Sequence, residues 1–234
     1  MDIAWSVAGG IIGFVAGLLL RSKVFRLSVA YGEPDRTTCA RCDAPIAGPF
    51  RCRQCHGWYG APLVLELVTA AVLALLLGRF AGLADAAAYA FVGALGVALA
   101  AIDLAVQRLP NQLTLPLYPG LLGLFGISAL TEGDPDKLLR AAAGGVVLGG
   151  CYLVLALASR GQLGIGDVKL AGGLGIALGW LGWPTLLAGA SFGFLLMSVV
   201  SLALLLVRRV TLQHSLSFGP FMLGGALIAV LAAG

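Results

Sequence analysis

Two aspartates, Asp103 and Asp167, have the residue type and the surroundings that acid–base chemistry needs. Each lies at one end of a long apolar segment. A charged side chain is costly to bury in a bilayer, so an acid in such a place is a functional candidate. Two neighbouring carboxyl groups cannot both ionise cheaply, so one can accept a proton from water while the other donates one. The pair predicts water activation of the kind that aspartic peptidases use, if the fold brings the two side chains together.

The same acids are compatible with other classes of protein. They could relay protons in a membrane transporter, or they could be two unrelated, solvated helix ends. The residues before Asp167 favour the peptidase. Gly164 and Gly166 have no side chain, so an extended substrate backbone can approach the acid closely. A transporter gives no reason for these glycines, and a membrane scaffold would tolerate the loss of both acids.

Four cysteines form two CxxC pairs in the segment after the first apolar stretch. The pairs are Cys39 with Cys42 and Cys52 with Cys55, and nine residues separate them. Each CxxC bend directs two thiolates at one metal ion, and two bends complete a tetrahedral Zn²⁺ site without an open position. The pattern predicts a structural zinc site. Redox chemistry is the alternative that the same motif allows.

The composition predicts that membrane helices hold these residues. The chain has 234 residues, of which 59% are hydrophobic and 11% are charged, against about 25% charged in soluble domains. This excludes a soluble globular enzyme and makes membrane lipid the expected surroundings. The formal net charge is +4, but no basic face or stacking motif accompanies it, so we expect no nucleic-acid partner.

Eight apolar segments are predicted to cross the membrane, because a span needs about 20 mostly apolar residues. The 38 uncharged residues 170–207 make two spans, with a turn at 179–184. We therefore expect an all-α, polytopic membrane protein with about eight transmembrane helices and a small zinc-binding cytoplasmic loop. The other six segments are residues 3–20, 61–78, 86–102, 109–131, 141–159 and 215–234.

The distribution of Lys and Arg predicts the orientation of these spans. Eight crossings put both termini on one side. Eleven basic residues fall on the side of segment 21–60, and three fall on the opposite side. Cytoplasmic loops carry the excess of Lys and Arg. We therefore expect segment 21–60 in the cytoplasm, both termini outside it, and Asp103 and Asp167 near the cytoplasmic face.

The first apolar segment is predicted to be a permanent and closely packed helix. Its basic residues follow the apolar run, whereas a cleaved signal peptide has them in front. Gly9, Gly13 and Gly17 recur at every fourth position. Small residues at this spacing let two helix backbones approach closely in a membrane.

Four motifs occur in order along the chain and together carry a family resemblance. They are the paired CxxC loop followed by Tyr59, Pro62 and Glu66; Ile102 and Asp103 with Leu109 and Pro110; the Gly-Ile-Gly-Asp segment 164–167; and the Ser-Phe-Gly-Pro-Phe segment 217–221. The sequence resembles the prepilin peptidases, or type IV leader peptidases, which are intramembrane aspartic peptidases with a GxGD motif.

The resemblance implies cleavage of the basic leader from type IV prepilins or prepilin-like secretion subunits at the bacterial inner membrane, with Asp103 and Asp167 as the catalytic acids. It implies a shortened amino-terminal domain at residues 1–82 and a six-helix peptidase domain at 83–234. S-adenosylmethionine is an expected cofactor only if this chain retains methyltransferase activity, because longer family members have a larger insert between the CxxC pairs. A proton-coupled transporter remains the alternative function.

Overall fold

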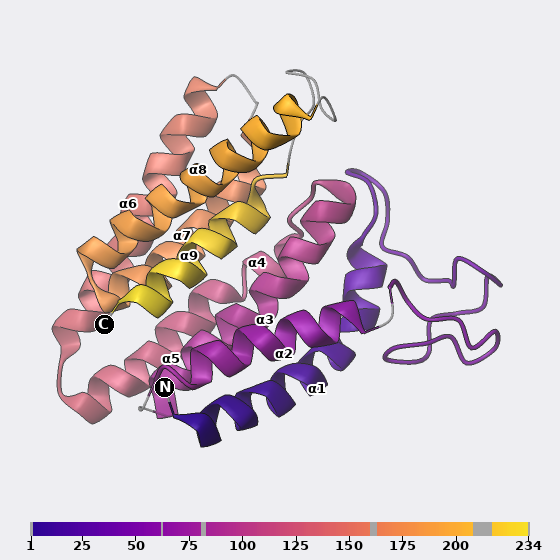
Figure 1. Cartoon of the computed structure of the whole chain (residues 1–234), viewed down its shortest axis with the longest axis horizontal. Helices are drawn as coiled ribbons and strands as arrows, with labels where there is room; N and C mark the ends of the chain where they lie inside the picture. Colours follow the sequence, from indigo (N-terminus) through magenta and orange to yellow (C-terminus); the bar gives the residue numbers. More distant parts are fainter. Residues whose placement is uncertain (1, 62, 81–82, 160–162, 208–216, 234) are drawn as a thin grey trace. The chain divides into compact units, whose positions relative to one another are not determined.

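The computed structural model describes residues 2–61, 63–80, 83–159, 163–207 and 217–233 (Figure 1). In these residues the chain forms nine helices, and its only β-structure is two isolated bridges. The predicted all-α class is therefore confirmed. The chain divides into two compact units, Met1–Pro110 and Asn111–Gly234, and each is described by itself.

The first unit contains three helices that pack on one another, as Figure 1 shows. Helix α1 (Ile3–Leu27) starts at Asp2, whose side chain accepts a hydrogen bond from the Ala4 N–H at 2.9 Å. The helix continues past the end of the apolar stretch, because its basic last turns contain good helix formers. Helices α2 (Val64–Leu77) and α3 (Leu83–Val106) complete the unit.

The glycine stripe of α1 packs directly on the backbone of α2, as the four-residue spacing predicts. Gly9, Gly13 and Gly17 are all buried. A methyl group at Gly13 would lie 2.5 Å from the Thr69 carbonyl oxygen, and one at Gly17 would lie 2.7 Å from the Glu66 Cα. Neither contact leaves room for a side chain, so the two helices depend on glycine at these positions.

We expect Gly13→Ala to destabilise the protein by about 1–3 kcal/mol, because the new methyl group overpacks this contact. Gly10 provides a matched control on the same helix. A methyl group there would lie 3.9 Å from the Ala74 Cβ, so Gly10→Ala is expected to be neutral or to stabilise the helix by up to about 1 kcal/mol. Thermal unfolding of the two purified variants measures the difference, and equal melting temperatures would contradict the packing argument.

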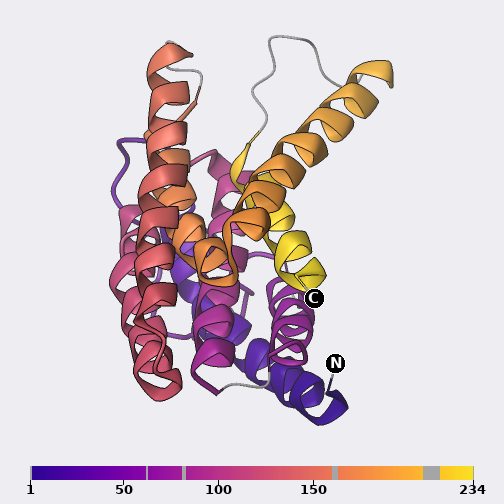
Figure 2. The same cartoon turned by 90° about the vertical axis from the view of Figure 1, so that its left-hand side faces the viewer.

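The second unit contains six helices. They are α4 (Asn111–Thr114), α5 (Leu117–Glu132), α6 (Pro135–Ala158), α7 (Ile165–Leu181), α8 (Trp183–Leu206) and α9 (Gly219–Ala232). Helix α6 packs mainly on α7, and α8 packs mainly on α9. Figure 2 shows α8 inclined to α6.

Helix α7 is the most enclosed element of this unit. Every residue from Leu170 to Trp180 is buried, since α4, α5, α6, α8 and α9 all contact the helix. Arg140 of α6 donates hydrogen bonds to the carbonyl oxygens of Gly179 at 3.0 Å and Trp180 at 2.9 Å. These bonds satisfy the last turn of α7, where backbone acceptors have no partner within the helix. The helix that begins at the GxGD motif is therefore fixed along its length.

Each of the eight predicted apolar segments contains a helix, which confirms the polytopic membrane architecture. Five stretches of the described residues are long and apolar enough to cross a membrane, and they include α1, α3, α6 and α8. The fifth, Asn111–Glu132, holds both α4 and α5, so the predicted single span at 109–131 is interrupted. The interruption falls at Pro116, which has no N–H for a continuous helix.

The turn predicted between α7 and α8 is also present. It lies at Gly182, whose φ of 134° is a conformation that other residues rarely adopt. Helices α2 and α9 are apolar but shorter, with 14 residues each. The predicted functional division between residues 82 and 83 stays a prediction. The compact first unit extends to Pro110 because α3 packs on α1 and α2.

Candidate functional site

The two CxxC pairs lie in two similar hairpins of the segment that joins α1 to α2. One hairpin is closed by the bridge between Thr38 and Pro45, and the other by the bridge between Arg51 and Trp58. In both, the N–H of the first cysteine donates to a carbonyl oxygen five residues further on, at 2.8 Å in the first hairpin and 2.9 Å in the second. Each hairpin therefore presents its CxxC bend in the same way.

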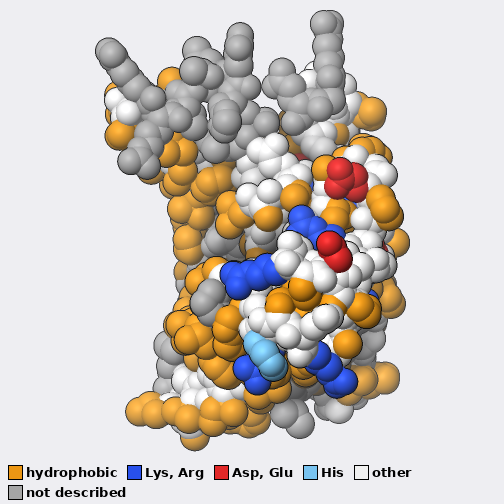
Figure 3. All heavy atoms as spheres, turned by 90° about the vertical axis from the view of Figure 1, so that its right-hand side faces the viewer, with side chains coloured by type: hydrophobic (Ala, Val, Ile, Leu, Met, Phe, Trp, Pro, Cys, Tyr) orange, Lys and Arg blue, Asp and Glu red, His pale blue; other side chains and the backbone are white. Residues whose placement is uncertain are grey.

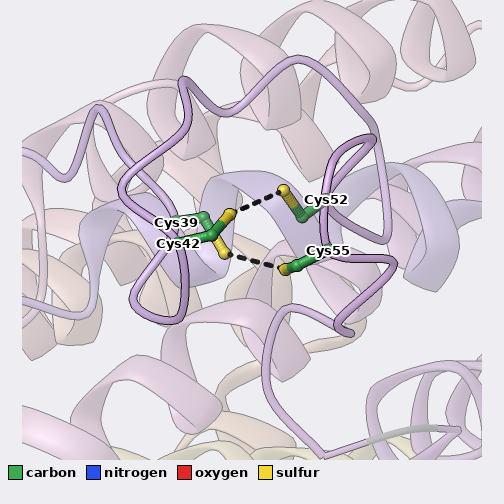
Figure 4. A group of neighbouring side chains, drawn as sticks. All are labelled: Cys39, Cys42, Cys52 and Cys55. Carbon is green, nitrogen blue, oxygen red and sulfur yellow. Dashed lines mark hydrogen bonds between the residues drawn. The ribbon is translucent and has the colours of Figure 1, made fainter.

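The four sulfur atoms lie within 4.8 Å of one another, and Figure 4 shows the side chains pointing toward a common centre. The Sγ atoms of Cys39 and Cys55 are 3.7 Å apart, and those of Cys42 and Cys52 are 3.6 Å apart. Zn–S bonds of about 2.3 Å in a tetrahedron separate sulfur atoms by about 3.8 Å. The donor set and its spacing fit a tetrahedral zinc ion. The exposed His56 lies outside this group.

The surroundings shift the pKa values of two of the thiols in opposite directions. The N–H groups of Cys55 and Gln54 lower the pKa of the Cys52 thiol to about 6. At Cys42, the Ala44 N–H lowers the pKa, but burial and the hydrogen bonds of the other cysteines outweigh it and raise the pKa to about 12. Cys52 is thus readily ionised, whereas metal binding at Cys42 must displace a proton.

A buried ion pair fastens the cysteine segment to the helices. Arg21 of α1 donates from Nε to Glu66 Oε1 at 2.6 Å and also pairs with Oε2. Its Nη1 donates to the carbonyl oxygens of Ala61 at 2.8 Å and Tyr59 at 3.1 Å. The Arg21 side chain is 2% exposed, and that of Glu66 is 0% exposed. One guanidinium therefore joins α1, α2 and the end of the cysteine segment.

The local sequence patterns do not predict this pair. Arg21 counts there only among the basic residues of segment 21–60, and Glu66 only among the residues of the family resemblance, whereas the structure buries both side chains. The sequence does contain a pattern that predicts the burial of Arg21, because this residue continues the four-residue repeat of Gly9, Gly13 and Gly17. It must therefore lie on the face of α1 that packs on α2.

The exposed surface of the cysteine segment carries four arginines together with the acids Glu33, Asp35 and Asp43. Figure 3 shows several Lys and Arg side chains on the side of the molecule where this segment lies. The exposed arginines of the segment are Arg36, Arg41, Arg51 and Arg53.

Asp103 lies in the last turn of α3, in the first unit. Its side chain is 5% exposed, and its backbone oxygen accepts a hydrogen bond from the Gln107 N–H at 2.8 Å. The helix ends at Val106, and Gln107 then turns the chain with a φ of 51°. The acid is therefore held at the end of a membrane helix, as the sequence predicts.

Asp167 lies in the first turn of α7, in the second unit. Gly164 is the residue before the helix, and its N–H donates to Asp167 Oδ2 at 3.3 Å. A methyl group at Gly164 would lie 3.3 Å from the same oxygen, so the missing side chain leaves the carboxylate accessible. Asp167 itself is half-buried, and so is Gly166.

Lys169, two residues after Asp167, fixes the first turns of α7 through hydrogen bonds to neighbouring helices. Its Nζ donates to Asn111 Oδ1 at 2.8 Å, and its carbonyl oxygen accepts from the Tyr118 hydroxyl at 2.8 Å. These bonds tie α7 to α4 and α5. The structure thus brings the four cysteines together and places Gly164 against Asp167. Asp103 and Asp167 belong to different units, so their pairing stays a prediction.

The fold and the sites define a multi-pass membrane protein with a cluster of four cysteines that could hold a metal ion and a largely buried helix that begins at the GxGD motif. The model of the type IV leader peptidase family matches residues 90–207, which include both aspartates. The chain belongs to the type IV leader peptidase family, and it is a protease. No solved structure matches it.

Several relatives named prepilin leader peptidase/N-methyltransferase are similar over most of the chain. The Aeromonas salmonicida (strain A449) protein is 35% identical over 214 residues, which cover 84% of this chain and 71% of the relative. The Burkholderia pseudomallei (strain 1026b) protein is 36% identical, and the match covers 96% of this chain and 84% of the relative. The Escherichia coli (strain K12) protein is 30% identical, and the match covers 93% of this chain and 92% of the relative.

Proposed function

We propose that the protein removes the basic leader peptide from type IV prepilins or prepilin-like secretion subunits, at the cytoplasmic face of the bacterial inner membrane. The observation that carries this proposal is the start of α7, where a glycine leaves the Asp167 carboxylate accessible on a helix whose residues from Leu170 to Trp180 are all buried. Family membership and the names of the relatives favour peptide cleavage over proton transport.

In this proposal Asp103 and Asp167 divide the work on the attacking water. We assign the role of general base to Asp167, because the N-terminus of α7 stabilises a carboxylate. Asp103, whose side chain is buried, is assigned the role of general acid, which protonates the carbonyl oxygen or the leaving group. Two carboxyl groups in different surroundings can hold these opposite roles at one pH. Gly164 and Gly166 would admit the extended backbone of the substrate.

The cysteine site is proposed to hold Zn²⁺ through Cys39, Cys42, Cys52 and Cys55. Four thiolates leave no coordination position for water, so the metal would stabilise the segment and take no part in cleavage. Methylation of the new amino terminus from S-adenosylmethionine is a second candidate activity. It is favoured by the Escherichia coli relative, which this chain matches over nearly its whole length and whose name contains N-methyltransferase.

The proposed orientation places the cysteine segment in the cytoplasm and both termini outside it. The exposed arginines of that segment and the overall asymmetry of Lys and Arg support this orientation. A prepilin with its apolar helix in the bilayer and its basic leader in the cytoplasm would then present the scissile bond at the membrane depth predicted for the two aspartates.

Incubation of the purified full chain with a candidate prepilin tests the function. We expect a product that is shorter by the leader, detected by gel shift and mass spectrometry. A proton-coupled transporter would leave the prepilin intact and would carry solute in proteoliposomes. Intact substrate across a panel of prepilins, together with solute flux, would overturn the proposal.

A further inference from the structure

The first turn of α7 is the least enclosed part of that helix, and it carries Asp167. The residues of α7 before Leu170 are exposed or half-buried, whereas every residue from Leu170 to Trp180 is buried. Gly164 and Gly166 add backbone freedom at the same place, because glycine loses more conformational entropy on folding than any other residue. The carboxylate therefore needs contacts from outside this turn to keep one position during catalysis.

Two hydrogen bonds from other helices meet at Lys169, at the end of this turn. Its Nζ donates to Asn111 Oδ1 of α4 at 2.8 Å, and its carbonyl oxygen accepts from the Tyr118 hydroxyl of α5 at 2.8 Å. The first bond has a charged donor, which makes it about twice as strong as a bond between neutral groups. One bond holds the side chain of Lys169 and the other holds its backbone, so the two together fix where α7 begins.

The packing around Gly172 shows that the Tyr118 contact depends on the sequence of α7. A methyl group at Gly172 would overlap the Tyr118 hydroxyl, so the phenol reaches the Lys169 carbonyl only because residue 172 is glycine. Helix α6 also approaches Gly172 closely, since a methyl group at Gly149 would lie 3.3 Å from the Gly172 Cα. The second turn of α7 is thus packed between α5 and α6, with little room to shift.

We propose that Lys169 and Tyr118 are positioning residues for Asp167. This inference rests on the proposed function of Asp167. Asn111 is the acceptor that holds the Lys169 side chain, and it follows Asp103 by eight positions. The same bond therefore joins the start of α7 to the chain that leaves the helix of the other acid. A misplacement of about 1 Å in a catalytic constellation can lower the rate about 100-fold, so such contacts matter for cleavage.

The test measures kcat and KM of prepilin cleavage separately in the purified full chain. We expect Lys169→Met, Asn111→Leu and Tyr118→Phe each to lower kcat by about tenfold or more, because the Asp167 carboxylate loses its fixed position. KM is expected to stay close to the wild-type value, since these side chains hold α7 and not the leader. Asn111→Asp keeps an oxygen acceptor for the Lys169 ammonium, so it is expected to cleave at about the wild-type rate.

Two control variants make the same chemical changes elsewhere. Lys137→Met acts at the opposite end of α7, where the Lys137 Nζ lies 5.8 Å from the centre of the Trp180 ring. Tyr31→Phe removes a hydroxyl from a side chain that is 94% exposed. Both are expected to keep the wild-type kcat and KM.

A double variant shows whether two of these residues act through one bond. Lys169→Met combined with Asn111→Leu is expected to have the kcat of Lys169→Met alone, because both changes remove the same hydrogen bond. Losses that multiply would overturn the shared bond. A wild-type kcat in Lys169→Met or in Tyr118→Phe would remove that residue from the proposal, and a rise in KM alone would place it on the substrate instead.

Amide hydrogen exchange gives a measurement that does not depend on cleavage. We expect the amides of residues 168–172 to exchange faster in Lys169→Met and Tyr118→Phe than in the wild type, and Lys137→Met to leave them unchanged. Wild-type exchange in the first two variants would overturn the inference. A wild-type chain that cleaves no prepilin would refute the proposed function, and the exchange rates would still decide whether these bonds hold α7.

Discussion

Asp103→Asn and Asp167→Asn are each expected to lower the rate of leader cleavage by about 10²–10⁴-fold or more, because an amide can neither accept nor donate the proton that each role requires. The loss should appear in kcat, since both carboxyl groups act on the water and the scissile bond and contribute little to holding the leader. Initial rates at saturating prepilin, with equal amounts of each purified variant, measure it.

Two other acids provide controls within the same units. Asp85 lies in the first turn of α3, the helix that carries Asp103, and Asp136 lies in the first turn of α6, which packs on the helix of Asp167. Asp85→Asn and Asp136→Asn are expected to cleave at the wild-type rate. A wild-type rate in either Asp103→Asn or Asp167→Asn would remove that residue from the proposed mechanism.

Glu66→Gln is expected to destabilise the protein by about 3–5 kcal/mol, because it leaves the Arg21 guanidinium buried without a counter-charge. The same loss is expected for Arg21→Met, which leaves the Glu66 carboxylate unpaired. Thermal unfolding in detergent measures the loss. Cysteine accessibility to a thiol reagent is expected to rise in both variants, because the cysteine segment is fastened through Arg21.

An exposed ion pair and a double variant control this prediction. Lys137 and Glu132 are 2.6 Å apart with side chains 35% and 40% exposed, so Glu132→Gln should cost less than about 1 kcal/mol. Arg21→Met with Glu66→Leu removes both charges and should recover much of the stability. Equal losses in Glu66→Gln and Glu132→Gln would show that the buried pair does not hold the segment.

The sequence by itself determined the features that depend on neighbouring residues. The CxxC spacing predicted the four-cysteine cluster, because a four-residue bend fixes where its two sulfur atoms point. The glycine repeat of α1 predicted its contact face, and the place of Asp167 at the end of an apolar segment predicted its position at the end of a helix. The membrane spans followed from the length of the apolar runs alone. All of these signals lie within a few turns of chain.

Only the tertiary structure decided which distant residues meet. Arg21 and Glu66 are 45 positions apart, and nothing in either local pattern names the other as its partner. The burial of the Tyr59 hydroxyl and the enclosure of α7 by five helices likewise depend on packing between separate elements. The spacing of residues along the chain determines which face of its helix a residue occupies. Which residue it contacts on that face depends on how all the helices of the unit pack together.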